Sequence, residues 1–154
     1  MLQIISVSNQ KGGVGKTTTA INLGTSLAAV GKKVLIIDLD PQGNASTGLG
    51  IGSEDRQYTT YDVILGTKTF SEIIKETKVP GLKIAPSNTD LSSADIDLTG
   101  DNKRVLKLRN ALANGFKNSL DYILIDCPPA LNILTVNAFV ASSSVLVPLQ
   151  AEFF

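Results

Sequence analysis

Runs of consecutive apolar residues constrain the fold of this 154-residue chain more than any other feature of its sequence. They occupy residues 34–37, 122–125 and 145–147, and a similar β-branched run occupies residues 2–8. A run without alternating polar positions is typical of a strand that is buried on both faces of a parallel sheet. Segments with helical spacing of apolar residues separate these runs. The alternation predicts an α/β fold of three layers, in which a mainly parallel sheet is covered by helices on both faces.

The helical pattern is clearest at residues 16–30, where Gly31 is expected to end the helix. The spacing of Thr69 and Glu72 is that of a capping box and predicts a second helix through residue 77. The glycine-rich segment 43–56 is expected to be a loop. The remaining expected elements are helices at residues 60–65, 90–98, 102–113 and 131–141 and a short strand at residues 82–85.

The composition excludes several classes of function. The chain has no histidine and one cysteine, Cys127, which excludes histidine catalysis, an internal disulfide framework and a thiolate-built metal centre. Its 14 Lys and Arg residues balance 14 Asp and Glu residues, so no global basic field attracts DNA or anionic lipid. No apolar stretch approaches the roughly 18 residues of a membrane span, and no signal segment is visible. The expected location is therefore the cytoplasm, without a membrane partner.

A glycine-rich loop between the first strand and the first helix ends in Gly15-Lys16-Thr17, the end of the phosphate-binding pattern Gly-x-x-x-x-Gly-Lys-Ser/Thr. The glycines allow backbone N–H groups to surround phosphate oxygens, and the helix N-terminus adds partial positive charge. Lys16 would reach the β- and γ-phosphates, and Thr17 would bind magnesium. The first position of the pattern is Gln10 instead of glycine. We therefore expect a P-loop NTPase fold; the alternative is a glycine-rich turn without a ligand.

Three aspartates follow expected strands at the same edge of the sheet, where open α/β sheets bind ligands: Asp38, Asp40 and Asp126. Asp126 fits the Walker B acid, which supports magnesium. Asp38 and Asp40 are two residues apart and would point the same way if strand geometry continues. One of them could support the metal shell while the other faces the γ-phosphate.

Three segments in this order resemble the ParA/MinD superfamily of ATPases. Residues 11–18 resemble its deviant Walker A motif, residues 38–44 the ParA/Soj version of its second motif, and residues 125–129 its Walker B segment. Residues 147–150 resemble the strand that follows. The chain is thus similar to a ParA/Soj-type chromosome or plasmid partition ATPase over its whole length.

The resemblance implies a role for each site residue. Lys11 would be the signature lysine, which reaches the nucleotide of the partner subunit in a homodimer with ATP sandwiched between the subunits. Lys11, Lys16 and Asp40 would be catalytic, with Asp40 assisting the attacking water. Magnesium would be held by Thr17, Asp38 and Asp126. The nucleotide would be bound by Lys11, Gly12, Gly13, Val14, Gly15, Lys16, Thr17 and Thr18.

The function that the resemblance implies is ATP binding and Mg²⁺-dependent hydrolysis in a protein that segregates chromosomal or plasmid DNA. Such proteins are stimulated by a ParB-type partner and bind DNA non-specifically in the cytoplasm, at the nucleoid. They are also longer, so residues 1–154 are expected to be a single P-loop nucleotide-binding domain truncated at its C-terminus, weakly active or inactive alone. The DNA-binding surface would lie in the missing part. The basic cluster that is present is Lys103, Arg104, Lys107 and Arg109, which fits a solvated helix face.

Other functions stay open. A MinD-like ATPase that positions the division site at the membrane is the first, although residues 41–44 favour the partition branch. An iron–sulfur carrier of the same superfamily is the second, for which Cys127 alone is a poor ligand. A non-catalytic nucleotide-binding or interaction fragment is the third.

Overall fold

A computed structural model describes residues 1–13, 15–113, 115–116 and 118–151 of the chain. Within these residues, a six-stranded sheet has the order β3-β4-β2-β5-β1-β6. Every pairing is parallel except that of β3 with β4. The strands are β1 (Gln3–Val7), β2 (Val34–Asp38), β3 (Lys75–Glu76), β4 (Leu82–Ala85), β5 (Tyr122–Asp126) and β6 (Ser144–Leu146).

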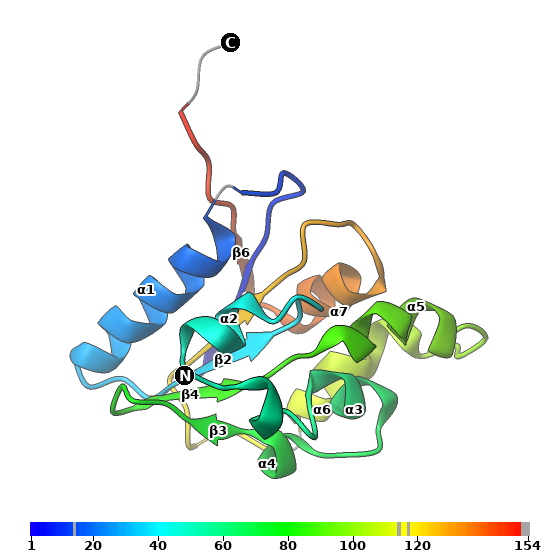
Figure 1. Ribbon diagram of the computed structural model, residues 1–154, viewed down its shortest axis with the longest axis horizontal. Helices are drawn as coiled ribbons and strands as arrows, with labels where there is room; N and C mark the ends of the chain where they lie inside the picture. Colours follow the sequence, from blue (N-terminus) through cyan, green and yellow to red (C-terminus); the bar gives the residue numbers. More distant parts are fainter. Residues whose placement is uncertain (14, 114, 117, 152–154) are drawn as a thin grey trace.

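Helices cover both faces of this sheet, which confirms the expected three-layer fold. One face carries α1 (Lys16–Ala29) and α2 (Asn44–Gly48), and Figure 1 shows α1 across the sheet from the helices of the other face. That other face carries α3 (Thr60–Leu65), α4 (Phe70–Ile73), α5 (Ala94–Asp97), α6 (Lys107–Ala113) and α7 (Ile133–Ala141). Three short 3₁₀ segments complete the described elements: η1 (Ser53–Asp55), η2 (Thr89–Ser93) and η3 (Arg104–Leu106). Within the described ranges, no helix has the length and apolarity needed to cross a membrane.

The central strand β2 shows why apolar and polar residues do not alternate in these runs. All five of its residues are buried. Leu35 and Ile37 belong to the larger apolar cluster beneath α3, α6 and α7, whereas Val34 and Ile36 belong to the smaller cluster beneath α1. Because successive side chains of a strand point to opposite faces, both faces of β2 must be apolar.

The parallel register brings the carboxyl ends of three strands to one edge. Asp126 pairs with Val7 of β1 on one side and with Asp38 of β2 on the other. The glycine-rich loop leaves β1 at this edge and leads into α1. The fold therefore collects the predicted phosphate loop and the predicted aspartates in one place.

Two expectations from the sequence were wrong. The segment 43–56 is not an irregular loop, since it contains α2 and η1. Its helical turn is stabilised by tertiary contacts, because both the backbone N–H and the hydroxyl of Ser46 donate to Asp38. The helix that begins after Thr69 ends at Ile73 instead of continuing to residue 77. Ile74 is extended, and the next two residues form β3, which pairs with β4.

Candidate nucleotide-binding site

An open cleft of about 530 Å³ lies at the carboxyl edge of the sheet. It is lined by the glycine-rich loop, the start of α1, the segment after β2, one residue after β5 and one residue near the end of the described chain. The lining residues are Gly12, Gly13, Gly15, Lys16, Thr17, Thr18, Asp40, Gln42, Asn44, Pro129 and Gln150. A larger hollow of about 610 Å³ lies at the opposite, amino-terminal edge between Lys33, Gly81 and Phe116, where there is no glycine-rich loop.

The backbone of the loop explains its glycines. Gly13 and Gly15 have φ values of 73° and 81°, in the left-handed region that favours glycine. A Cβ atom at either position would meet nothing within 4 Å, so backbone conformation and not space requires the glycines. The side chain of Gln150 donates to the Gly13 carbonyl oxygen at 3.2 Å, and in Figure 1 the segment after β6 passes beside the start of α1. Val14, predicted to bind nucleotide, lies outside the described residues.

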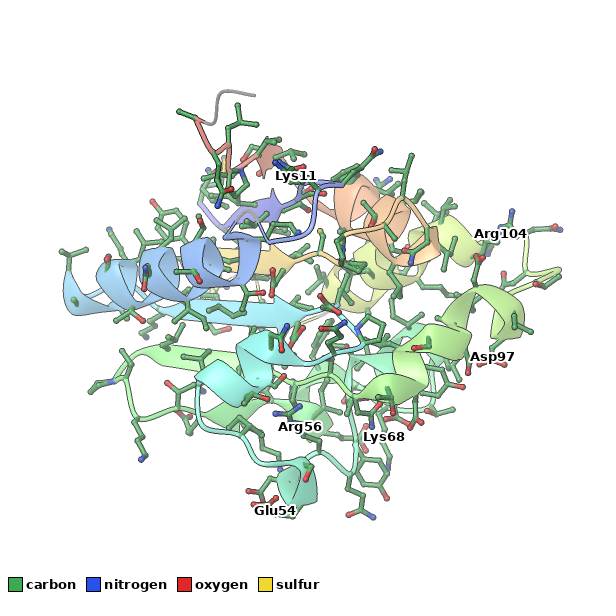
Figure 2. The ribbon with its side chains drawn as sticks, turned by 45° about the horizontal axis from the view of Figure 1, so that its top comes forward. Lys11, Glu54, Arg56, Lys68, Asp97 and Arg104 are labelled. Carbon is green, nitrogen blue, oxygen red and sulfur yellow. The ribbon has the colours of Figure 1, made fainter. Side chains whose placement is uncertain are left out.

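The two lysines of the loop differ in their surroundings. Lys16 is only 7% exposed, and its ammonium donates to the Lys11 carbonyl oxygen at 3.3 Å, so its charge lies inside the loop. Lys11 is exposed, and Figure 2 shows it at the outer end of the molecule, on the loop that precedes α1. The Lys11 backbone N–H donates to Asn9 Oδ1 at 2.8 Å, which holds the start of the loop.

Thr17 and Asp126 form the direct link between the loop and the sheet. Thr17 Oγ1 donates to Asp126 Oδ2 at 2.8 Å. Within the described part of the chain, the other oxygen, Asp126 Oδ1, is buried without a hydrogen-bond partner. Burial, together with the nearby charges of Asp38 and Asp40, raises the Asp126 pKa to about 7, although the hydrogen bond from Thr17 opposes the rise. Such an oxygen is costly to leave unsatisfied, so a bound ligand or cation would stabilise it.

These oxygen ligands suit magnesium. A carboxylate and a hydroxyl are hard donors, and Mg²⁺ is usually held by one or two carboxylates together with substrate phosphates and water. Within the described residues, no group of three or more Asp, Glu, His or Cys side chains could hold a metal by itself. The Thr17 hydroxyl and the Asp126 carboxylate fit a cation whose other ligands are phosphate oxygens and water.

Asp38 is fully buried, and hydrogen bonds from the protein use both of its oxygens. Oδ1 accepts from the Asp40 N–H at 3.1 Å, and Oδ2 accepts from the N–H and the hydroxyl of Ser46 at 3.0 and 2.7 Å. Burial raises the Asp38 pKa, although these hydrogen bonds oppose the rise. Its carboxylate thus holds the chain segment between residues 40 and 46.

Asp40 is 8% exposed and lines the cleft. Its Oδ1 accepts from the Gln42 N–H at 3.0 Å, an interaction that orients the carboxylate above the turn that follows β2. Gln42 and Asn44 line the same cleft. The sequence contained both in the 38–44 motif, but nothing in the pattern singled them out as site residues.

The structure brings most of the predicted residues together. The cleft is lined by Gly12, Gly13, Gly15, Lys16, Thr17, Thr18 and Asp40. Asp126 contacts this lining through its hydrogen bond with Thr17, and Asp38 contacts it through its hydrogen bond with the Asp40 N–H. Sequence reasoning missed Ser46 and Ser87, which no local motif marks, and it did not assign Gln150 of the segment 147–150 to the site. A parallel sheet with a glycine-rich loop, a buried lysine and a threonine–aspartate pair at its carboxyl edge defines a nucleotide-binding domain of the P-loop NTPase class.

Comparison with known proteins identifies the family. The family model described as an AAA domain matches residues 2–154, and the chain belongs to that family, in its ParA/Soj branch. The chain is 54% identical over 157 residues to the chromosome partitioning protein ParA of Caulobacter vibrioides, covering 99% of this chain and 58% of that protein. It is 47% identical over 154 residues to the sporulation initiation inhibitor protein Soj of Bacillus subtilis, covering 100% of this chain and 60% of that protein.

Solved structures share the fold. Cobyrinic acid a,c-diamide synthase from Mycobacterium smegmatis, with bound ATP analog and magnesium, has a TM-score of 0.95 and 38% identity over 99% of this chain and 62% of that one. A plasmid partition protein from Borrelia burgdorferi bound to AMPPNP has a TM-score of 0.86 and 27% identity over 97% of this chain and 63% of that one. Both similarities extend over the phosphate loop and the aspartate-bearing strands of this chain.

Proposed function

We propose that the cleft binds Mg²⁺-ATP and that the protein hydrolyses ATP in order to segregate chromosomal or plasmid DNA. The observation that carries the proposal is the pairing of Thr17 with Asp126, whose second oxygen is buried and has no partner among the residues that the structure describes, together with the buried Lys16. A threonine and an unsatisfied carboxylate suit a magnesium ion, and a buried lysine in a glycine-rich loop suits phosphate.

The residue roles follow from position. The backbone of Gly12, Gly13 and Gly15 and the ammonium of Lys16 would bind the β- and γ-phosphates, with Thr18 beside them. Thr17 and Asp126 would hold magnesium, which neutralises charge on the phosphates. Asp40, whose carboxylate lines the cleft, would orient the attacking water. The oxygens of Asp38 already accept three hydrogen bonds, so we assign it to support of the Asp40 segment in place of direct metal binding.

The activity of the whole protein is part of this proposal, because the chain spans only about 60% of the length of the relatives it matches. The name of the Caulobacter vibrioides relative, chromosome partitioning protein ParA, favours partition of DNA. We propose a homodimer with ATP between its subunits, in which Lys11 reaches the nucleotide of the partner. A ParB-type stimulator, non-specific DNA binding and a cytoplasmic location at the nucleoid belong to the same proposal.

The alternative functions have weaker support. The Caulobacter vibrioides relative and the Borrelia burgdorferi structure carry partition names, which favour partition over a MinD-like role in positioning division. An iron–sulfur carrier would need a thiolate, but Cys127 is fully buried and burial raises its pKa to about 12.

Calorimetric titration of residues 1–154 with ATP, with and without magnesium, tests the proposal. We expect saturable binding that magnesium strengthens. Release of phosphate from ATP by the protein at its native length then tests hydrolysis. Absence of binding would contradict the proposed site, and binding without hydrolysis by the native protein would favour the non-catalytic alternative.

A further inference from the structure

Four buried residues at the carboxyl edge form a closed ring of hydrogen bonds. Asp38 Oδ2 accepts from the Ser46 hydroxyl at 2.7 Å, and the Ser46 hydroxyl oxygen accepts from the Ser87 N–H at 3.1 Å. The Ser87 hydroxyl donates to the Asp40 carbonyl oxygen at 2.6 Å. The Asp40 N–H donates to Asp38 Oδ1 at 3.1 Å, which closes the ring.

The ring holds the backbone of Asp40 from both sides. Its N–H is bound by Asp38, and its carbonyl oxygen is bound by Ser87 and by the Gly43 N–H at 2.9 Å. Asp38, Ser46 and Ser87 are completely buried, so water does not compete for these bonds. Asp40 itself lines the cleft, so these bonds fix the backbone of a residue of the site.

Ser87 is the member of the ring that lies farthest along the chain from the 38–44 motif. It follows β4, and 47 residues separate it from Asp40. Arg56 links the segment of Ser87 to the turn after Asp40, since its guanidinium donates to the carbonyl oxygens of Gly43 and Ser87 at 3.5 and 3.4 Å. Figure 2 shows Arg56 directly beside α2. Gly43 has φ 66°, and a Cβ there would lie 2.5 Å from Arg56 Nη1. Both the backbone conformation and the close approach of Arg56 therefore favour glycine at this position.

We propose that Ser87 is a positioning residue for ATP hydrolysis, which acts by holding the backbone of Asp40 so that its carboxylate orients the attacking water. The inference rests on the proposed function, in which Asp40 has that role. Ser87 itself does not line the cleft and would not touch the nucleotide. Its loss should therefore affect turnover and not binding, because a displaced water-orienting group raises the barrier of the chemical step.

The test compares steady-state hydrolysis and ATP affinity of the native-length protein with its variants Ser87→Ala, Asp40→Ala and the double variant. Ser6→Ala is the matched control, since Ser6 is also a completely buried serine whose hydroxyl donates to a backbone carbonyl, that of Ala138, but far along the chain from this ring. We expect Ser87→Ala to lower kcat about tenfold while ATP affinity changes less than about twofold. Ser6→Ala should retain the wild-type kcat.

The double variant separates positioning from a general structural role. Because Ser87 acts through Asp40, adding Ser87→Ala to Asp40→Ala should cause no further loss of turnover. If Ser87→Ala does not fold, which loss of ATP binding would reveal, Ser87→Cys fills the same space with a much weaker donor and tests the same hydrogen bond.

The outcomes are distinct. Normal turnover in Ser87→Ala, together with strongly reduced turnover in Asp40→Ala, overturns the inference and leaves the proposed function standing. A further loss in the double variant also overturns it, since Ser87 would then act without Asp40. Wild-type turnover in Asp40→Ala overturns the assigned role of Asp40, and the inference with it.

Discussion

Asp38 and Asp126 lie directly opposite each other in the parallel pairing of β2 and β5, and both are completely buried. Burial raises the pKa of each carboxyl, and their proximity adds to the rise at Asp126. The two carboxylates differ in their hydrogen bonds. Both oxygens of Asp38 accept hydrogen bonds from the protein, whereas one oxygen of Asp126 has no partner among the described residues. The register of the sheet thus places a structural carboxylate beside one that is available to a cation.

Replacement of Lys16 by alanine should abolish most nucleotide binding. The variant loses charge-assisted hydrogen bonds to phosphate, which contribute about 1.5–3 kcal/mol each, so affinity should fall by a factor of roughly 10 to 100. Calorimetry on residues 1–154 measures the change. Lys32→Ala, at an exposed lysine beyond α1, is the control and should bind ATP normally. Equal affinity of wild type and Lys16→Ala would contradict the phosphate-binding role.

Asp40→Ala should slow hydrolysis in the native-length protein and largely spare nucleotide binding. Orienting an attacking water is a role in the transition state, so the loss should appear in kcat, by a factor of about 100 or more. Turnover assays at saturating ATP, paired with ATP titrations, measure both quantities. A variant that lost ATP binding but turned over its bound ATP normally would show that Asp40 binds nucleotide instead.

Without nucleotide, the free energy of unfolding should fall as the pH rises from about 4 to 7. The Asp126 pKa is about 7 in the folded protein and 3.8 when unperturbed, so the folded state binds more protons in this window. A carboxyl that is protonated only in the folded state makes stability decrease with pH, by at most about 1.4 kcal/mol per pH unit. Asp126→Asn should flatten this decline, although Asp38, whose pKa is also raised, retains part of it.

Denaturant unfolding of residues 1–154 across this pH range tests the effect. The control is Glu54→Gln, which removes an exposed carboxylate on η1 and should leave the slope unchanged. Deprotonation of Asp126 should also make magnesium-dependent ATP binding stronger as the pH rises. Identical slopes for wild type and Asp126→Asn would refute the assignment.

Residues 1–154 alone should bind DNA weakly. Their net charge is zero, and the basic cluster around α6 is partly neutralised, since Lys107 forms a 2.6 Å ion pair with Asp101. In Figure 2, Arg104 lies at the right of the view and Lys11 near its top. Fluorescence anisotropy with duplex DNA at physiological salt should show no micromolar binding, because non-specific affinity comes from Lys and Arg that neutralise phosphates. Micromolar, ATP-dependent binding that Arg104→Ala weakens would place a DNA surface on this part of the chain.

The elements that were predictable from the sequence are those with a strong local pattern. The fully apolar runs of β2 and β5, the helical spacing of α1 and the capping box at Thr69 and Glu72 all appear in the structure. The wrong predictions concern segments whose local pattern is weak or is overridden by tertiary contacts. Residues 43–56 form α2 because Asp38 binds Ser46, and residues 75–76 form a strand because β4 offers an unpaired edge.

The amino-acid sequence by itself determined every strand except β3, the longer helices, the phosphate loop and the aspartates at the ends of β2 and β5, because each is written in contiguous residues. Only the tertiary structure decided that, within the described ranges, one oxygen of Asp126 lacks a hydrogen-bond partner while both oxygens of Asp38 accept hydrogen bonds, and that Ser87 holds the backbone of Asp40. The physical reason is that burial and hydrogen bonding depend on which distant segments meet. No local sequence pattern predicts that residues 38, 46 and 87 come into contact or that their side chains are buried from solvent.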